Sequence, residues 1–136
     1  MKKFLWLALL ATLAWAPAAR AQIAPQGCAN CSTVVIKAGA GSLVDGYVTV
    51  SGAGYLYVIN SPTAYVSGNI AYGTASGDYQ DCISITAAGS QGLSSFGLPY
   101  EKFSAGISLA WSSTACPATS GAITLQSAVM MKARSQ

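Results

Sequence analysis

Residues 46–72 constrain the fold of this chain more than any other part of the sequence. They read GYVTVSGAGYLYVINSPTAYVSGNIAY, so aliphatic residues alternate with tyrosines and small polar residues between breaks that contain glycine or proline. A period of two residues is typical of a β-strand with one buried face, because successive side chains of a strand point to opposite sides. We therefore predict an antiparallel β-meander in this stretch.

The aliphatic face of this meander predicts its register. Val50 closes the alternating pattern of the first strand, and Leu56 opens that of the second. They can share one face of a hairpin only if they lie opposite each other, because a shift of one residue turns every side chain over. That pairing requires a three-residue turn at 52–54 whose last glycine is left-handed. The same reasoning places Val58 opposite Val66.

The opposite face of the meander is the candidate binding site. It carries four tyrosines, which are Tyr47, Tyr55, Tyr57 and Tyr65. Aromatic rings with hydroxyl groups can stack on sugar rings or pack against another subunit. Alternatively, these tyrosines cover one face of a twisted sheet or line the core of a two-sided sandwich. The sequence leaves both possibilities open.

Strand patterns recur along the rest of the chain, over residues 32–37, 82–87, 103–111 and 121–132. We expect one face of the third segment to bury Phe103, Ile107, Leu109 and Trp111, and one face of the last to carry Ile123, Leu125, Val129 and Met131. Phe96 and Leu98 should anchor the serine- and glycine-rich residues 89–100. Short strands between turns predict an all-β fold, an antiparallel β-sandwich with a small β-barrel as the alternative.

The first residues have the pattern of an export signal. Lys2 and Lys3 precede an apolar run over residues 4–18, and Ala19, Arg20 and Ala21 follow it. This pattern predicts a secretory signal peptide over residues 1–21. Its apolar run is too short to span a bilayer, and no later stretch is long enough, so we expect no membrane span in the mature chain. Residues 22–136 are then a single β-rich domain, periplasmic, extracellular or at the cell surface.

Four cysteines follow the predicted signal: Cys28, Cys31, Cys82 and Cys116. An even number after an export signal predicts two disulfides, for which three connectivities are possible. We favour distant partners for the first two cysteines, because closing loops of tens of residues would stabilise the domain by roughly 3–4 kcal/mol each. The pair could instead close on itself. A strand pattern follows it, which argues against a redox-active motif at a helix N-terminus.

The charges and the missing histidines exclude several functions. The two lysines and one arginine of the leader account for the formal charge of +3, and the remaining cations and anions balance. A neutral domain lacks the basic surface that nucleic-acid binding needs. Without histidine, Ser-His-Asp and Cys-His catalysis and imidazole metal sites are impossible. We expect no enzyme, cofactor or metal; Asp78 and Asp81 could form a carboxylate pair but more simply belong to a solvated turn.

Two resemblances bear on function. Ser51-Gly52-Ala53-Gly54-Tyr55 resembles the SGxxY pattern of exported lysozyme inhibitors of the membrane-bound C-type class, which are small cysteine-containing β-barrels of the bacterial envelope. The size, export signal, cysteines and low charge are also similar to those of fimbrial subunits and spore-coat-U-like surface proteins. The first resemblance implies inhibition of an envelope enzyme. The second implies a structural role at the cell surface.

Two functional hypotheses follow. The first is an exported structural or adhesive surface protein, a subunit of an extracellular fibre or coat that assembles with itself or another surface protein through its strand edges. Residues 121–132 or 22–30 could supply or receive the added strand. The second is a monomeric envelope binding module or inhibitor that uses the tyrosine face to bind a glycan or a lysozyme-like enzyme.

Overall fold

The computed structural model describes residues 24–98, 101–117 and 119–136, so the predicted signal peptide lies outside the described residues. The described chain is all-β. Its first strand lies at the edge of a sheet, and its last strand is long and lies inside the same sheet. The strands are β1 (Gln26–Cys31), β2 (Thr33–Lys37), β3 (Gly41–Val50), β4 (Gly54–Ile59), β5 (Asn69–Ala71), β6 (Tyr79–Ile85), β7 (Gly89–Gly92), β8 (Lys102–Phe103), β9 (Ile107–Ser112), β10 (Ser120–Ala122) and β11 (Ala128–Ser135). One 3₁₀ turn, η2 (Leu93–Phe96), follows β7.

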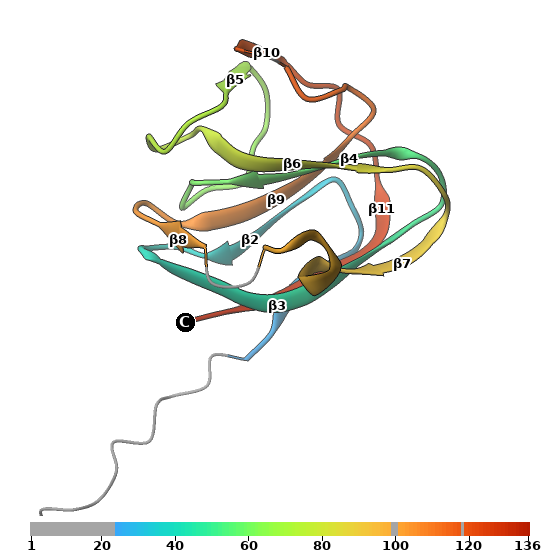
Figure 1. Cartoon of the computed structure of the whole chain (residues 1–136), viewed down its shortest axis with the longest axis horizontal. Helices are drawn as coiled ribbons and strands as arrows, with labels where there is room; N and C mark the ends of the chain where they lie inside the picture. Colours follow the sequence, from blue (N-terminus) through green and yellow to red (C-terminus); the bar gives the residue numbers. More distant parts are fainter. Residues whose placement is uncertain (1–23, 99–100, 118) are drawn as a thin grey trace, which may run out of the picture.

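The strands form two stacked antiparallel sheets, as predicted. Sheet A has the order β1-β11-β3-β7, with β8 paired to the start of β3. Sheet B has the order β2-β9-β4-β6. Figure 1 shows the two sheets as separate layers of a sandwich, so of the two predicted architectures the sandwich is confirmed and the closed barrel is not. A small sheet of β5 and β10 lies over the outer side of sheet B.

The main core lies between sheets A and B. It contains the aliphatic residues of β3 and β4 that the alternating pattern assigned to one buried face, Val48, Val50, Leu56 and Val58. The predicted set Phe103, Ile107, Leu109 and Trp111 is also buried there, although Phe103 comes from β8 and the others from β9. Leu98 is buried and Phe96 packs against the same core, as expected for two anchors.

The predicted hairpin between β3 and β4 is wrong. These strands lie in different sheets, and residues 51–53 carry the chain from one sheet to the other. Val50 is paired with Gly89, and Leu56 with Ile83 and Trp111. The alternating pattern identifies the buried face correctly, but two strands that face each other across a sandwich satisfy it as well as two strands of a hairpin.

Gly54 is required for a reason other than the left-handed turn that we predicted. Its φ is not positive, unlike that of Gly68, Gly77, Gly89 and Gly97. A Cβ atom built at Gly54 would lie 2.5 Å from a ring carbon of Trp111 and 2.8 Å from the Ser112 carbonyl oxygen. The indole therefore packs directly on the backbone where β4 begins.

Two further predictions about the buried faces are wrong. Val66 is 80% exposed and belongs to the loop between β4 and β5. The predicted strand over residues 121–132 is broken, because the chain leaves the small β5–β10 sheet after Ala122 and enters sheet A at Ala128. Met131 therefore lies in the main core, whereas Val129 is exposed and Leu125 packs on the outer side of sheet B.

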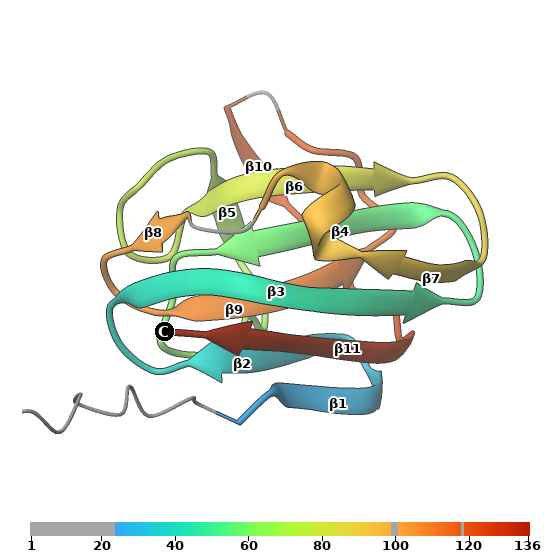
Figure 2. The same ribbon diagram turned by 60° about the horizontal axis from the view of Figure 1, so that its bottom comes forward.

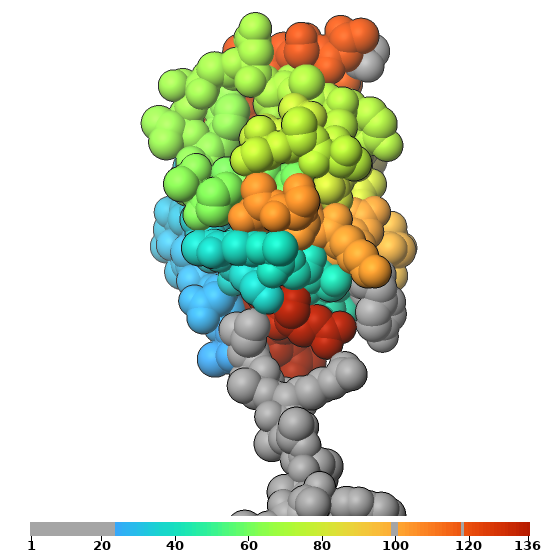
Figure 3. Space-filling view, turned by 90° about the vertical axis from the view of Figure 1, so that its left-hand side faces the viewer, coloured from blue at the N-terminus to red at the C-terminus, as the bar shows by residue number. Residues whose placement is uncertain are grey.

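A third layer covers the outer side of sheet B. It consists of β5, β10 and the loops beside them, and it encloses a second core of Tyr57, Ile59, Ile70, Tyr79, Ala110 and Ile123. Figure 3 shows this layer, in green and orange-red, at the top of the molecule. We call it the cap. Asn60 is fully buried below the cap and donates hydrogen bonds to the Thr74 carbonyl at 2.8 Å and to the Ser104 hydroxyl at 2.9 Å.

The two predicted disulfides are present, but our preferred pairing is wrong for one of them. Cys28 is bonded to Cys31 within β1, so this bridge closes a very short loop. Cys82 of β6 is bonded to Cys116, 34 residues away, and this bridge fastens the cap to sheet B. Within the described ranges, no helix has the length and apolar character needed to cross a membrane.

Candidate functional site

The four predicted site tyrosines do not share one face. Tyr47 lies on the outer face of sheet A and is 38% exposed, whereas Tyr55 and Tyr57 lie on the outer side of sheet B. Tyr65 belongs to the loop between β4 and β5 and packs against the same second core. The predicted common face is wrong because β3 and β4 lie in different sheets, so their outward sides point in opposite directions. The structure therefore leaves one of the four, Tyr47, on an open sheet face.

Tyr57 and Tyr79 fasten the cap to sheet B. The Tyr57 hydroxyl lies 3.0 Å from both the Thr114 and Ala115 carbonyl oxygens, and the Tyr79 hydroxyl donates to the Pro117 carbonyl. Their rings meet edge to face with centroids 5.3 Å apart. Burial raises the pKa of Tyr57 to about 12, so this hydroxyl stays a hydrogen-bond donor at any physiological pH. Tyr57 is completely buried and cannot touch a ligand.

Tyr47 stands in the middle of a row that crosses sheet A. Lys132 of β11 is its partner on one side and Gly92 of β7 on the other, and Gly27 of β1 is the next partner of Lys132. The two glycines at the ends of this row have no side chains, so the tyrosine and lysine side chains rise above bare backbone. The next pair of β3 and β11 on the same face, two residues along, is Asp45 with Arg134.

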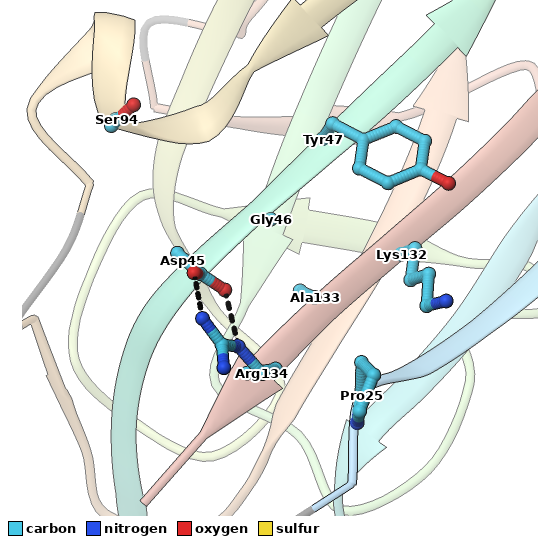
Figure 4. A pocket seen from close by; sticks show the side chains of 8 residues that line it. All are labelled: Pro25, Asp45, Gly46, Tyr47, Ser94, Lys132, Ala133 and Arg134. Carbon is cyan, nitrogen blue, oxygen red and sulfur yellow. Dashed lines mark hydrogen bonds and ion pairs between the residues drawn. The ribbon is translucent and has the colours of Figure 1, made fainter.

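These side chains line a hollow of about 430 Å³ on the outer face of sheet A (Figure 4). Arg134 and Asp45 form a two-pronged ion pair, with Nε 2.9 Å from Oδ1 and Nη2 bonded to Oδ2. This hydrogen bond lowers the pKa of Asp45, so the carboxylate stays charged above mildly acidic pH. Pro25 and Ser94 form two sides of the hollow. We call this site the sheet A hollow.

The second surface of interest is the outer edge of β1. Figure 2 shows β1 at the border of sheet A, beside β11. It pairs with β11 along one side, and within the described residues no other strand hydrogen-bonds to its outer side. Its sequence, QGCANC, contains no charged residue and no proline. The row of backbone N–H and C=O groups on the outer side can therefore accept another strand.

Three other edge strands carry devices that natural proteins use against strand addition: β2, which ends in Lys37 at a register shift against β9, and also β6 and β7. The edge strand β6 of sheet B carries Asp81, which is paired with Val58 and thus turned toward the inside of the sandwich. Inward-pointing charges discourage edge pairing because another strand would bury them further. The edge strand β7 has only four residues, and η2 follows it at once. β1 contrasts with β6 and β7, because it lacks the inward charge of β6 and is longer than β7.

Asp81 meets Glu101, which precedes β8. One oxygen of each carboxyl group, Asp81 Oδ2 and Glu101 Oε2, is buried and has no hydrogen-bond donor among the described residues. Burial, a hydrogen bond to Asp81 and the charge of Asp81 raise the pKa of Glu101 to about 7. A proton on Glu101 can therefore bridge the two carboxyl groups below neutral pH. Sequence reasoning did not bring this pair together, because Glu101 resembles a surface residue next to Lys102.

The other predicted carboxylate, Asp78, has a local structural contact. Its Oδ2 accepts a hydrogen bond from the Ala75 backbone N–H at 3.2 Å and so helps to close the loop before β6. In the part of the chain that the structure describes, no three cysteine, aspartate or glutamate side chains gather as metal ligands would. Asp78 thus fits the solvated turn that was the simpler of the two interpretations, but for Asp81 that interpretation is wrong, because Asp81 lies in β6 with one carboxylate oxygen buried.

Comparison with protein-family models, with curated proteins and with solved structures finds no match to this chain. The pattern of residues 51–55 that resembles the lysozyme inhibitors lies where the chain crosses between the two sheets, and its Tyr55 is half-buried. The residues that sequence reasoning missed are Asp45, Lys132 and Arg134 beside Tyr47. Alternation marks all of them as outward-facing, but only the pairing of β3 with β11, far apart in sequence, brings them together.

Proposed function

We propose that this protein is an exported structural or adhesive surface protein that assembles with copies of itself through the open edge of β1. The observation that carries the proposal is the contrast between edges. β1 offers an unpaired, charge-free edge, whereas β6 turns Asp81 inward and β7 is short. Addition of a strand from another chain to such an edge is a common mode of protein association.

The composition of the chain supports this proposal. Charged residues make up 8% of the sequence, far below the roughly 25–35% of charged residues usual on the surface of a freely soluble small domain. A sparsely charged surface fits a protein that is partly covered in an assembly. The two disulfides support export, since such bonds persist in oxidising compartments outside the cytosol. The binding-module alternative is less favoured in its predicted form, because the cap buries Tyr57 and separates it from Tyr47 on sheet A.

The experiment is to image the chain from Gln22 onward by negative-stain electron microscopy and to measure its sedimentation over a range of concentrations. The proposal predicts oligomers or fibres that grow with concentration. Ala29→Lys places a charge on β1 at an exposed position, and we expect it to leave the protein monomeric with an unchanged fold.

A matched control separates edge blocking from a general charge effect. Ala88→Lys adds the same charge at an exposed position in the loop between β6 and β7. It should assemble like the unsubstituted protein. Uniform monomers of the unsubstituted chain at high concentration, or equal assembly of both variants, would contradict the proposal.

A further inference from the structure

The sheet A hollow gathers charges that are rare elsewhere in this chain. Residues 22–136 carry eight charged side chains, and three of them, Asp45, Lys132 and Arg134, line this one depression beside the exposed ring of Tyr47. The alternation of β11 puts Lys132 and Arg134 on the same outward face, and the register with β3 brings them to Tyr47 and Asp45. None of these side chains is needed for the core, since all four point away from it.

The polar groups in the hollow retain unused hydrogen-bonding capacity. A guanidinium group has five N–H donors, and Arg134 uses Nε and Nη2 for Asp45, so further N–H groups remain available. Asp45 likewise keeps lone pairs that accept hydrogen bonds, and both side chains are 45% exposed. Ser94, at the side of the hollow, adds a hydroxyl that can donate or accept. A ligand with several hydroxyl groups could satisfy all of these groups at once.

The shape of the hollow and its aromatic side chain fit a ring-shaped ligand. Figure 4 shows the Tyr47 ring leaning over β11, with the Asp45–Arg134 pair on one side and Lys132 on the other. Tyrosine presents a flat apolar face and a polar tip, so it can stack on the C–H face of a sugar ring while neighbouring groups bind its hydroxyls. A volume of about 430 Å³ is within the range of small-molecule sites.

The charge of the hollow selects among sugars. Arg134 and Asp45 neutralise each other, and Lys132 forms no ion pair within the described part of the chain, so the hollow has an excess of one positive charge. Hydrogen bonds between an ammonium and a carboxylate are about twice as strong as those between neutral groups. A sugar with a carboxylate would therefore gain a contact with Lys132 that a neutral sugar lacks.

From this geometry we propose that the sheet A hollow binds an acidic sugar residue, with its ring on Tyr47, its carboxylate at Lys132 and its hydroxyls at Asp45, Arg134 and Ser94. This site is separate from the outer edge of β1, so the proposal does not rest on self-assembly. A protein that displays many copies of one weak sugar site on an assembled surface would bind a polymer of such sugars more tightly than a single copy would.

The test is a titration of ¹⁵N-labelled protein, from Gln22 onward and at a concentration at which it is monomeric, with tri-galacturonic acid. We expect saturable shifts of the backbone amide signals of Tyr47, Gly92 and Lys132. Tyr47→Ala should weaken binding about tenfold. The control Tyr72→Ala removes a ring that is 68% exposed outside the sheet A hollow, and it should bind as the parent does.

Two further ligands test the sugar and the charge separately. The methyl ester of the same trisaccharide keeps the rings and loses the carboxylates, so the parent should bind it several-fold more weakly than the acid. Lys132→Gln should bind the ester and the acid equally. Tricarballylate has carboxylates but no sugar ring and should cause no saturable shifts at Tyr47. Three results would overturn the proposal. The parent could bind the ester as tightly as the acid, it could bind tricarballylate as tightly as the acid, or Tyr47→Ala could keep full affinity for the acid. Unchanged unfolding midpoints for Tyr47→Ala and Lys132→Gln would show that both variants fold.

Discussion

Asn60 shows how one buried polar residue can organise several loops. Besides its donated bonds, its Oδ1 accepts a hydrogen bond from the Ala105 backbone N–H at 2.9 Å, so the side chain joins residues 74 and 75 to residues 104 and 105. Buried polar groups are expensive when they lose their partners. The position reads as an ordinary turn residue in the sequence, because its partners come from far along the chain.

We expect Asn60→Ala to lower the free energy of unfolding by about 2–4 kcal/mol, because it leaves several buried backbone groups without partners. Urea denaturation followed by tryptophan fluorescence would measure the change. Asn69→Ala, at an exposed position in β5, is the matched control and should change the free energy by less than about 0.5 kcal/mol. A loss for Asn60→Ala no larger than that of the control would contradict the assigned role.

Glu101 should make the stability depend on pH in the neutral range. Its pKa is about 7 in the folded protein and close to 4.5 in the unfolded chain, so between these values the folded state binds the extra proton. The free energy of unfolding should therefore be largest near pH 4.5, fall as the pH rises to 7, and stay level above it. We expect a fall of about 1 kcal/mol, because solvent screens a partly buried pair.

Thermal or urea unfolding at pH 5 and pH 8 would measure this fall. Asp45, whose pKa is lowered, loses its charge only below this range and does not interfere. Glu101→Gln keeps a donor toward Asp81 and should remove most of the pH dependence. A parent protein whose stability rises between pH 5 and pH 8 would contradict the assignment.

At the level of elements, the two disulfides have unequal roles. Cys28–Cys31 lies within β1, where it stiffens the edge strand without joining it to another element. Cys82–Cys116 joins β6 to the cap next to the hydrogen bonds of Tyr57 and Tyr79. The cap is therefore held at one place by a covalent bond and two tyrosine hydroxyls.

The stability lost with each bridge should follow the length of the loop that it closes. Replacing Cys82 and Cys116 by serine should cost about 4 kcal/mol, and replacing Cys28 and Cys31 about 2 kcal/mol, in the chain-entropy model. Denaturation of the two double variants under the same conditions would compare them. The reverse order would show that the short bridge does more than close its own loop.

The elements also show what a sequence of this kind can predict. Alternation in β3, β4 and β9 identified the residues that fill the core, because burial acts on every second side chain of a strand. It did not reveal which strand pairs with which. Val50 and Leu56 satisfy the same pattern whether they meet in a hairpin or across a sandwich, and the partner of β3 is β11, at the other end of the chain.

The candidate sites were predicted only in part for the same reason. Tyr47 was singled out correctly as outward-facing, but its neighbours Asp45, Lys132 and Arg134 depend on long-range pairing. Tyr57 was grouped with Tyr47 because a tyrosine on an outward face looks the same whether water or a third layer covers it. The cap that buries Tyr57 is assembled from loop segments with weak strand patterns, β5 and β10.

At the scale of the whole molecule, the three layers leave open the two surfaces on which the proposals rest. The cap covers the outer side of sheet B, whereas among the described residues no further sheet covers the outer face of sheet A and no strand pairs with the outer edge of β1 (Figure 2). The two surfaces adjoin, because Pro25, just before β1, and Gly27 of β1 border the hollows around Tyr47. Strand addition at β1 would thus extend the face that carries the proposed sugar site.

Hydrogen exchange tests the central claim, assembly through the edge of β1, most directly. Backbone amides of residues 26–31 on the outer side of β1 should exchange rapidly in dilute protein and at least about tenfold more slowly in concentrated protein, because a second strand then accepts their hydrogen bonds. Amides of β6 and β7 should exchange at the same rate at both concentrations. Unchanged exchange in β1, or new protection in β6 or β7 instead, would contradict the account.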